Sequence, residues 1–361
     1  MRISGVAMVA ALALTGVAGC SDGPDRTAAV PIAAASTPAP ERLTLEVAAQ
    51  AFRSFIANDD VARASGDERL ALSWAADGHS QLTAAEYRKA AFVGDPVPRY
   101  DYGTPALYVP RLTTYPQWFV VSVPRTVRGE EKSERTAMLA FVRKSAGVRW
   151  RLSLATLLGE KTGEKAKEKA DEKTDEKTGA PKVVLDGEGY ATALATFDDS
   201  LVLRPNGVSA IQATLGEEGP DSVAARVMKS GPHTTGYYTR ARRAEKKEKE
   251  AGVASDDVLL STQSPIFALR TVGGGGLVLY AMTHETVTLL RNKERGRLGV
   301  PRGTEHLLNS IILTDEVHVT EMLQFAAAVP AKPGPKARSR PRAEVIAAAG
   351  DTVRAAVPQT P

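Results

Sequence analysis

Apolar side chains recur at helical spacing in three stretches near the beginning of the folded part of the chain. The first follows Thr44, a good N-cap residue, and its apolar stripe comprises Leu45, Ala48, Phe52, Phe55 and Ile56. The second covers about residues 67–75. The third opens at Thr83, where Thr-Ala-Ala-Glu forms a capping box, and stops before Pro96. The pattern therefore predicts three helices.

Beyond Pro96 the apolar positions cluster in short runs rich in β-branched and aromatic residues, and Pro, Gly and charged turns separate the runs. The predicted strands cover residues 106–109, 118–123, 138–142 and 148–154. In the last run apolar and polar residues alternate, which is typical of a sheet with one buried and one wet face. Helices followed by strands predict an α+β domain over residues 42–158.

The same order of elements recurs in a second predicted domain, residues 183–357. We expect helices at 188–201 and 221–228 and a flexible basic loop at about 240–252. Strands follow at 266–272, 277–282, 310–313, 317–325 and 345–357, with a second flexible basic loop at 331–342. Gly273–Gly276 supply the positive φ angles that a tight hairpin needs. This repetition predicts a duplicated domain.

Two stretches of low complexity separate the predicted parts. Residues 20–41 are rich in Ala, Pro, Ser and Thr and bury too little apolar surface to order themselves, so they predict a disordered tether. Residues 160–177 hold six Lys against seven Asp plus Glu and no apolar residue larger than Ala. We interpret residues 159–182 as a charged spacer that marks a domain boundary.

The start of the chain predicts a signal peptide over residues 1–19. Arg2 precedes an uncharged apolar run at 6–14, which is shorter than the ~20 residues of a membrane span. Val17-Ala18-Gly19-Cys20 follows and resembles the lipobox of bacterial lipoproteins. That resemblance implies cleavage before Cys20, a diacylglycerol thioether on its sulfur and an amino terminus that is free or acylated, for example with palmitate.

Cys20 is the only cysteine in the 361 residues. The chain therefore has no internal disulfide, and packing alone must hold its folded part together. Two acyl chains give a stable membrane attachment, whereas one gives marginal binding. The alternative is ordinary secretion with Cys20 left as a free thiol.

Charge and composition are those of a globular protein, with 43% hydrophobic and 24% charged residues and a formal net charge of +4. The positive charge is local: residues 240–250 hold six basic and three acidic side chains, and 332–342 hold five basic ones. Outside a cell such patches suit anionic lipid headgroups or wall polymers better than nucleic acid, and we expect no nucleic-acid partner. The alternative is that these residues form solvated loops.

Candidate catalytic and metal-binding residues are dispersed. The pairs His284-Glu285, Glu305-His306 and Glu316/His318 do not form a zinc motif, and we expect no metal and no cofactor. No Gly-x-Ser-x-Gly elbow occurs, and two Lys-Thr-Gly triplets lie in the spacer without a matching serine. The adjacent aspartates 198–199 and 256–257 diverge and make poor acid–base couples. Six aromatic residues either line an open cavity in the first domain or form its core: Trp74, Tyr87, Tyr100, Tyr102, Trp118 and Trp150.

The whole chain resembles a group of actinobacterial lipoproteins of unknown function. The resemblance rests on the lipobox, the Ala/Pro tether, the helical entry, the strand-rich half and the Gly-Pro-His-Thr-Thr-Gly turn at 231–236. The layout also resembles the nuclear-transport-factor-2-like (NTF2-like) cone, an α+β fold whose relatives include enzymes, binding modules and assembly factors. That resemblance implies two tandem domains, each with helices on a curved antiparallel sheet.

From these observations we expect a protein anchored through lipidated Cys20 to the outer face of the cell membrane. Its role would be that of a non-catalytic binding or assembly module with an envelope protein or lipid as partner. One alternative is a lipid or lipoglycan carrier, which would need a continuous apolar cavity. Another is a small-molecule enzyme, which would hold a His and a carboxylate with shifted pKa values in one cavity. The sequence leaves the oligomeric state open.

Overall fold

A computed structural model of the chain describes residues 42–159, 180–292, 296–308, 315–335, 337 and 340–358. The signal peptide, the lipobox, the tether and most of the charged spacer lie outside these ranges. Among the described residues, no helix combines the length and the apolar character needed to cross a membrane.

The first two helices agree with the sequence pattern. In α1 (Leu45–Ser65), the Thr44 hydroxyl accepts a hydrogen bond from the Val47 amide at 3.2 Å, and Gly66 ends the helix with a φ of 67°. The apolar stripe of α1 packs on the sheet and buries Phe52 and Phe55. Helix α2 (Glu68–Trp74) begins after the N-cap Asp67, so the prediction over 67–75 is confirmed.

Helix α3 (Asp77–Val93) begins before the predicted capping box. Thr83 lies inside the helix, where its hydroxyl donates to the His79 carbonyl at 3.0 Å. Contacts from distant strands set the true start: the Asp77 carboxylate accepts hydrogen bonds from Lys144 at 2.9 Å and Ser153 at 2.6 Å. The predicted start at Thr83 is therefore wrong, because tertiary contacts outweigh the local capping signal.

All four predicted strands of the first half are present, and one was missed. The strands are β1 (Tyr100–Tyr102), β2 (Ala106–Tyr108), β3 (Gln117–Val127), β4 (Arg135–Arg143) and β5 (Arg151–Leu158). The missed strand β1 has only three residues and carries little pattern. On the last strand the predicted alternation of wet and buried positions holds from Arg149 to Leu152 but fails from Ser153, which is buried.

The helices of the second half differ most from expectation. Residues 188–201 form turns and isolated bridges instead of a helix, because Ala191 donates to the Val109 carbonyl and Leu194 to the Ala268 carbonyl, each at 2.9 Å. Within 221–228 only a 3₁₀ turn, η4 (Val223–Arg226), is present. The helix before it, α4 (Val208–Glu218), follows the 3₁₀ turn η3 (Pro205–Gly207).

The predicted basic loop at 240–252 is a helix, α5 (Thr235–Ala251). Its Ala, Arg, Lys and Glu residues are all strong helix formers, so the charge run that indicated a loop has high helix propensity. Of the other predicted loop, 331–342, the described residues carry no helix or strand apart from an isolated bridge between Ala331 and Leu201.

The remaining strands are β6 (Val253–Ser261), β7 (Phe267–Arg270), β8 (Gly276–Leu290), β9 (Glu316–Val329) and β10 (Glu344–Ala356), with a 3₁₀ turn η6 (Glu305–Leu307) before β9. The glycine hairpin between β7 and β8 is confirmed, with φ of 87° at Gly273 and 79° at Gly274. The predicted strand 310–313 lies outside the described residues, and β6 was missed.

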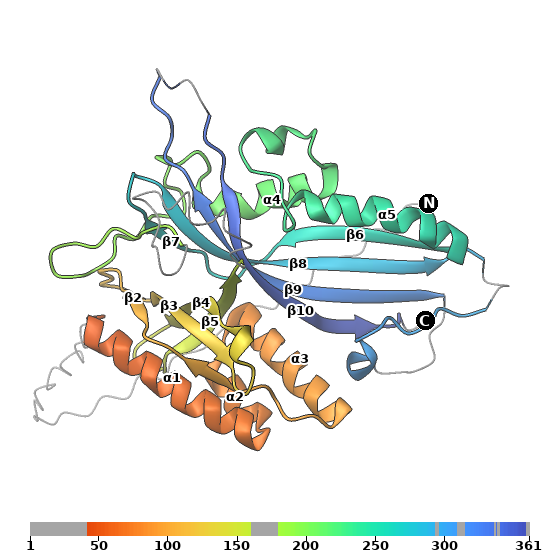
Figure 1. Ribbon diagram of the computed structural model, residues 1–361, viewed down its shortest axis with the longest axis horizontal. Helices are drawn as coiled ribbons and strands as arrows, with labels where there is room; N and C mark the ends of the chain where they lie inside the picture. The colour runs from red at the N-terminus through yellow and green to blue at the C-terminus, as the bar shows by residue number, and fades with distance from the viewer. Residues whose placement is uncertain are drawn as a thin grey trace, which may run out of the picture. The chain divides into compact units, whose positions relative to one another are not determined.

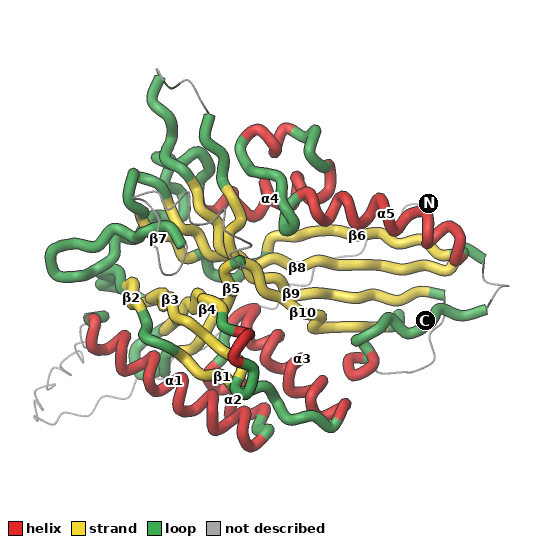
Figure 2. The backbone as a smooth tube through the Cα atoms, viewed as in Figure 1, coloured by secondary structure: helices red, strands yellow, loops and turns green. Residues whose placement is uncertain are grey.

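All of these strands belong to one antiparallel sheet with the order β1-β3-β4-β5-β10-β9-β8-β6 (Figure 1, Figure 2). Strand β2 adds to β3, and β7 adds to β8. The two halves join where Leu157 and Leu158 of β5 pair with Ala348 and Ala347 of β10. The α+β class is confirmed, while the assignment of the halves to NTF2-like domains stays a prediction.

The second half repeats the strand pairing of the first. Strands β1 to β5 correspond in order to β6 to β10, because β3 pairs with β1, β2 and β4 as β8 pairs with β6, β7 and β9. Val120 pairs with Tyr108 and Ala140, and Leu279 pairs with Phe267 and Ala326. All six side chains belong to one apolar cluster, so we align the two halves by matching Val120 with Leu279.

Three apolar clusters hold this arrangement together. One lies between α1 and the first half of the sheet, and one lies between α4 and the second half. The third combines residues that point away from these helices in both halves, such as Val120, Leu154 and Leu279. Within it the rings of Trp118 and Phe267 are 5.5 Å apart, edge to face. The two halves therefore share a core.

A buried polar bridge also joins the halves. The side chain of Gln324 on β9 is fully buried and reaches the backbone of β5. Its Oε1 accepts from the Ala155 amide at 2.9 Å, and its Nε2 donates to the Ser153 carbonyl at 3.3 Å. His79 on α3 lies 3.4 Å from the same Oε1. Burial lowers the pKa of His79 to about 4, against the Gln324 hydrogen bond, which raises it.

Candidate functional site

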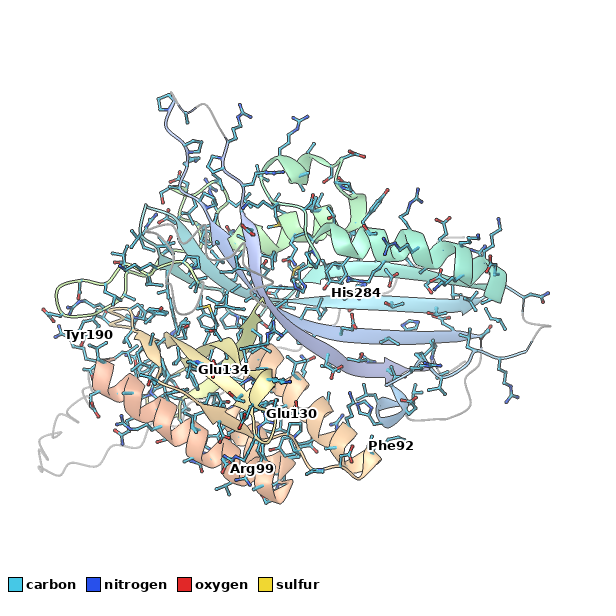
Figure 3. All side chains as sticks on the ribbon, in the orientation of Figure 1. Phe92, Arg99, Glu130, Glu134, Tyr190 and His284 are labelled. Atoms are coloured by element: carbon cyan, nitrogen blue, oxygen red, sulfur yellow. The ribbon has the colours of Figure 1, made fainter. Side chains whose placement is uncertain are left out.

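A cavity of about 310 Å³ lies between α4, α5 and the strands β6 and β8 of the second half. Figure 3 marks His284, which lies on β8 and forms part of its wall. Two aromatic rings and charges of both signs line the cavity: Glu217, Tyr237, Tyr238, Arg240, Asp257 and His284, with the apolar residues Gly216, Ala241, Ala244 and Leu259.

The turn before α5 sets the position of the cavity roof. The buried Thr234 hydroxyl donates to the Lys229 carbonyl at 3.0 Å and lies 3.2 Å from the Gly231 carbonyl. This turn starts the helix so that Tyr237 packs on the apolar cluster beneath α4. Gly219 ends α4 with a φ of 85°, and a Cβ there would lie 2.8 Å from the ring of Tyr238. A glycine at this position therefore leaves room for one wall of the cavity.

Two glutamates tie the helices to the edge strand β6. Glu217 of α4 accepts from the Leu259 amide at 3.3 Å, and Glu248 of α5 accepts from the Ser255 amide at 3.2 Å. These two bonds hold α4 and α5 against β6, with Asp257 midway between the two bonded residues of the strand.

At the sheet side of the cavity, His284 lies between two carboxylates. Its Nδ1 is 2.7 Å from Glu321 Oε2 on β9, and its Nε2 is 3.4 Å from Asp257 Oδ1 on β6. Thr286 donates to the same Asp257 oxygen at 2.6 Å. The ring of Tyr237 covers His284 with 5.4 Å between ring centroids, and Arg240 lies 4.3 Å from the centre of the Tyr237 ring.

The electrostatics follow from this geometry. Burial alone would lower the pKa of His284, but the hydrogen bonds to Asp257 and Glu321 outweigh burial and raise its pKa to about 9. Conversely, the hydrogen bond from His284 lowers the pKa of Asp257 despite partial burial. At neutral pH the site therefore holds an imidazolium between two acidic side chains.

This arrangement combines the features that the enzyme alternative predicts, a His and a carboxylate with shifted pKa values in one cavity. However, a general base needs a free ring nitrogen that faces its substrate. Both nitrogens of His284 are directed at carboxylates, and its raised pKa keeps it protonated near neutrality. The site can bind and orient a ligand, but His284 is poorly placed to take up a proton from one.

In the first half, charged and aromatic side chains pack together in the region that aligns with this cavity. By strand register, Arg125 corresponds to His284 and Tyr100 to Asp257. Arg63 of α1 enters this region, with its guanidinium carbon 4.6 Å from the centre of the Tyr100 ring, while Arg125 lies 4.2 Å from the same centre.

Carboxylates from two helices neutralise the buried Arg63. Its Nε donates to Asp59 at 2.8 Å, and its Nη1 donates to Glu86 at 3.0 Å. Burial raises the pKa of Asp59, although the contact with Arg63 opposes this rise. The first half thus holds an ion cluster around Arg63 in the region where the second half holds the cavity beneath α5.

The other histidines are dispersed, as the sequence indicated. His79 lies on α3, His233 in the turn before α5 and His306 in η6. His318 is hydrogen-bonded to Glu316 on the same strand, β9. In the described part of the chain, no group of three or more His, Cys, Asp or Glu side chains is arranged to hold a metal ion.

Some of the remaining candidates have structural partners, and others lie beyond the described ranges. Asp198 binds Arg270 at 3.0 Å. Tyr87 and Trp150 are buried and the other four aromatic residues of that set are half-buried, in agreement with a core role. The lipobox residues Val17, Ala18, Gly19 and Cys20 and both Lys-Thr-Gly triplets lie outside the described residues.

Sequence reasoning missed Glu321, Tyr237 and Arg240 as members of the site. Glu321 faces His284 only because β8 and β9 pair in one register, and a single sequence does not fix that register. Tyr237 and Arg240 belong to a segment whose charge indicated a loop. Helical periodicity of its apolar positions, at Tyr237, Ala241 and Ala244, was the available signal.

Comparison with known proteins gives relatives that are lipoproteins. An uncharacterised lipoprotein of Streptomyces coelicolor is 28% identical over 289 residues, which are 76% of this chain and 73% of that protein. An uncharacterised lipoprotein of Streptomyces avermitilis is 25% identical over 176 residues, 49% of this chain and 45% of that protein. The chain spans about half the length of the latter relative. No solved structure matches the chain. Residues 39–356 match the domain of unknown function DUF8094, and the chain belongs to this family.

Proposed function

We propose that this protein is an exported lipoprotein, anchored to the outer face of the cell membrane through diacylglycerol on Cys20. The lipobox and the apolar run before it support this proposal, as do the two lipoprotein relatives. Cleavage removes residues 1–19, and residues 20–41 tether the folded part to the membrane.

The folded part serves as a binding module, with the cavity beneath α5 as its ligand site. The observation that carries this proposal is the placement of His284, whose two ring nitrogens both face carboxylates while its ring forms part of the wall. A fixed charge cluster of this kind orients a ligand without exchanging protons with it. Because the lining charges are of both signs, the ligand is a small polar molecule with little net charge.

The chemistry of the wall disfavours the lipid-carrier alternative at this site. An acyl chain in the cavity would desolvate Glu217, Arg240 and Asp257 without offering them hydrogen bonds. A volume of about 310 Å³ also lies at the small end of the range for ligand pockets.

We further infer that the two halves arose by duplication of an NTF2-like unit. The repeated pattern of strand pairing supports this inference. After duplication the first half filled the end of its sheet with Arg63, and the second half kept an opening there.

Two measurements test the proposal. With Cys20 replaced by Ser, the protein should appear either in the soluble exported fraction or as an unprocessed chain that keeps residues 1–19. Mature protein that remains in the membrane fraction would contradict the anchor. For the cavity, small molecules released on denaturation of the purified protein are compared by mass spectrometry between the wild type and Tyr238→Ala. An exposed-site variant, Arg53→Gln on α1, serves as the control.

We expect a compound that co-purifies with the wild type and with the control but is depleted from Tyr238→Ala. Equal amounts in all three proteins, or none in any, would count against the cavity as a ligand site. Conversion of the bound compound during incubation would favour the enzyme alternative instead.

A further inference from the structure

Helix α5 segregates its charges around its circumference. At about 100° per residue, Arg242, Arg243, Lys246 and Lys249 lie within an arc of about 120° that contains a single acidic residue, Glu250. All five side chains are exposed. We refer to the four basic residues of this arc as the basic stripe.

The opposite side of α5 holds the helix on the protein. Tyr237, Ala241 and Ala244 face the cavity and the apolar cluster. The acidic Glu248 points inward and binds the Ser255 amide of β6. The acidic Glu245 lies at the flank of the stripe, 3.4 Å from Arg242. Of the three glutamates of α5, Glu248 thus points away from the basic stripe, Glu245 flanks it and Glu250 lies within its arc.

A further cation lies at the carboxyl end of α5. The exposed Arg291, just beyond β8, donates from Nε to the Val253 carbonyl at 2.7 Å and from its amide to the Gly252 carbonyl at 2.9 Å. These bonds hold its positive charge beside the negative end of the helix dipole. Figure 1 shows α5 running alongside β6, with β8 next to it.

We propose that the basic stripe of α5 is a docking surface for anionic phospholipid headgroups and orients the lipoprotein on the bilayer. This proposal rests on the proposed membrane anchor, since a tethered chain meets the lipid surface continually. No residue of α5 is buried, and the stripe is charged instead of apolar, so the helix lies against headgroups without inserting into the hydrocarbon.

The magnitude of the effect follows from surface electrostatics. Each Lys or Arg close to an anionic membrane strengthens binding by about fivefold. The attraction decays over about 10 Å at 0.1 M salt and about 3 Å at 1 M. Removing two members of the stripe should therefore weaken vesicle binding by about 20-fold or more at low salt and have little effect at 1 M salt.

The test uses the full chain with Cys20→Ser, so that vesicle binding does not depend on lipidation. Co-sedimentation is measured with vesicles of phosphatidylcholine alone and with vesicles that contain phosphatidylglycerol. Binding to the neutral vesicles corrects for attachment through the apolar N-terminal run. The variant is Arg243→Glu with Lys246→Glu, neither of which lines the cavity.

The matched control is Arg69→Glu with Lys89→Glu on α2 and α3, where both side chains are exposed. Variant and control change the net charge equally, so only the location of the charges differs. Circular dichroism of both proteins verifies that the helices are intact.

We expect salt-sensitive binding to the anionic vesicles that the stripe variant loses and the control retains. Equal losses in both proteins, or no preference for anionic over neutral vesicles, would overturn the proposal. Binding to soluble polyphosphate but not to anionic vesicles would overturn it as well and would indicate an anionic polymer. None of these outcomes depends on whether Cys20 is lipidated in the cell. The proposed anchor and the proposed docking surface can therefore be refuted independently of each other.

Discussion

Replacing Gln324 by Leu tests whether the two halves of the chain are one folding unit. The Gln324 amide is fully buried and is the polar link from β9 to the backbone of β5. Leucine has a similar volume but cannot hydrogen-bond. The Ala155 amide and the Ser153 carbonyl would therefore lose this partner inside the protein.

Each buried polar group left without its partner costs about 1–3 kcal/mol. The bond to Ala155 is short at 2.9 Å, whereas the bond to Ser153 is long at 3.3 Å. We therefore expect Gln324→Leu to reduce the free energy of unfolding by about 2–4 kcal/mol, a large fraction of the roughly 5–15 kcal/mol of an ordinary domain.

Guanidinium denaturation measures this change with two probes. All three tryptophans, Trp74, Trp118 and Trp150, lie in the first half, so fluorescence reports on that half and far-ultraviolet circular dichroism on the whole chain. In the wild type the two transitions should coincide, because both halves share a sheet and a core.

The matched control is Met138→Leu, at the position of β4 that corresponds to Gln324 by register. Met138 is also fully buried, and a volume-conserving apolar exchange costs less than about 1.5 kcal/mol. A loss below about 0.5 kcal/mol for Gln324→Leu, or wild-type transitions that separate, would refute the reasoning that the halves depend on each other.

Three further predictions concern titratable side chains that are buried or partly buried. The pKa of His284 is raised from 6.5 to about 9, so its ion cluster stabilises the fold fully below pH 6.5 and loses this stabilisation as the pH rises to about 9. At about 1.4 kcal/mol per pKa unit the loss is roughly 3 kcal/mol, and it should be much smaller in His284→Gln when unfolding is measured from pH 6 to 9.5. The pKa of His79 is lowered to about 4, so the free energy of unfolding should fall as the pH drops from 6.5 to 4. In the same assay this fall should be smaller in His79→Asn. Arg63→Met should cost about 3–5 kcal/mol in denaturant titrations, because the buried Asp59 and the half-buried Glu86 lose their cationic partner. A smaller cost in the double variant with Asp59→Leu would support this reason, and an equal or larger cost would not.

Local sequence signals predicted the elements that local physics determines. The Thr44 cap, the apolar stripe of α1 and the glycine hairpin at 273–276 depend on neighbours within a few residues. The prediction failed where contacts with residues distant in the sequence determine the secondary structure. Residues 188–201 have helical spacing, but their amides bond to Val109 and Ala268, and the start of α3 depends on Lys144 and Ser153.

The candidate site was beyond the reach of the sequence for a related reason. His284, Asp257 and Glu321 lie on three strands and meet only through the register of β6, β8 and β9. Taken singly in the sequence, each of these residues resembles an ordinary exposed polar residue. The repeated order of strands was visible in the sequence. The pairing of β5 with β10 was not, because nothing in the sequence of either strand predicts which strand it pairs with.

The most direct test of the account is the mass of the intact mature protein purified from membranes. We predict a chain that begins at Cys20 and carries the added mass of a diacylglycerol on its sulfur, with or without a further acyl group on the amino terminus. A mature chain with an unmodified Cys20 thiol, or one that keeps residues 1–19, would contradict the proposed anchor and the role that depends on it.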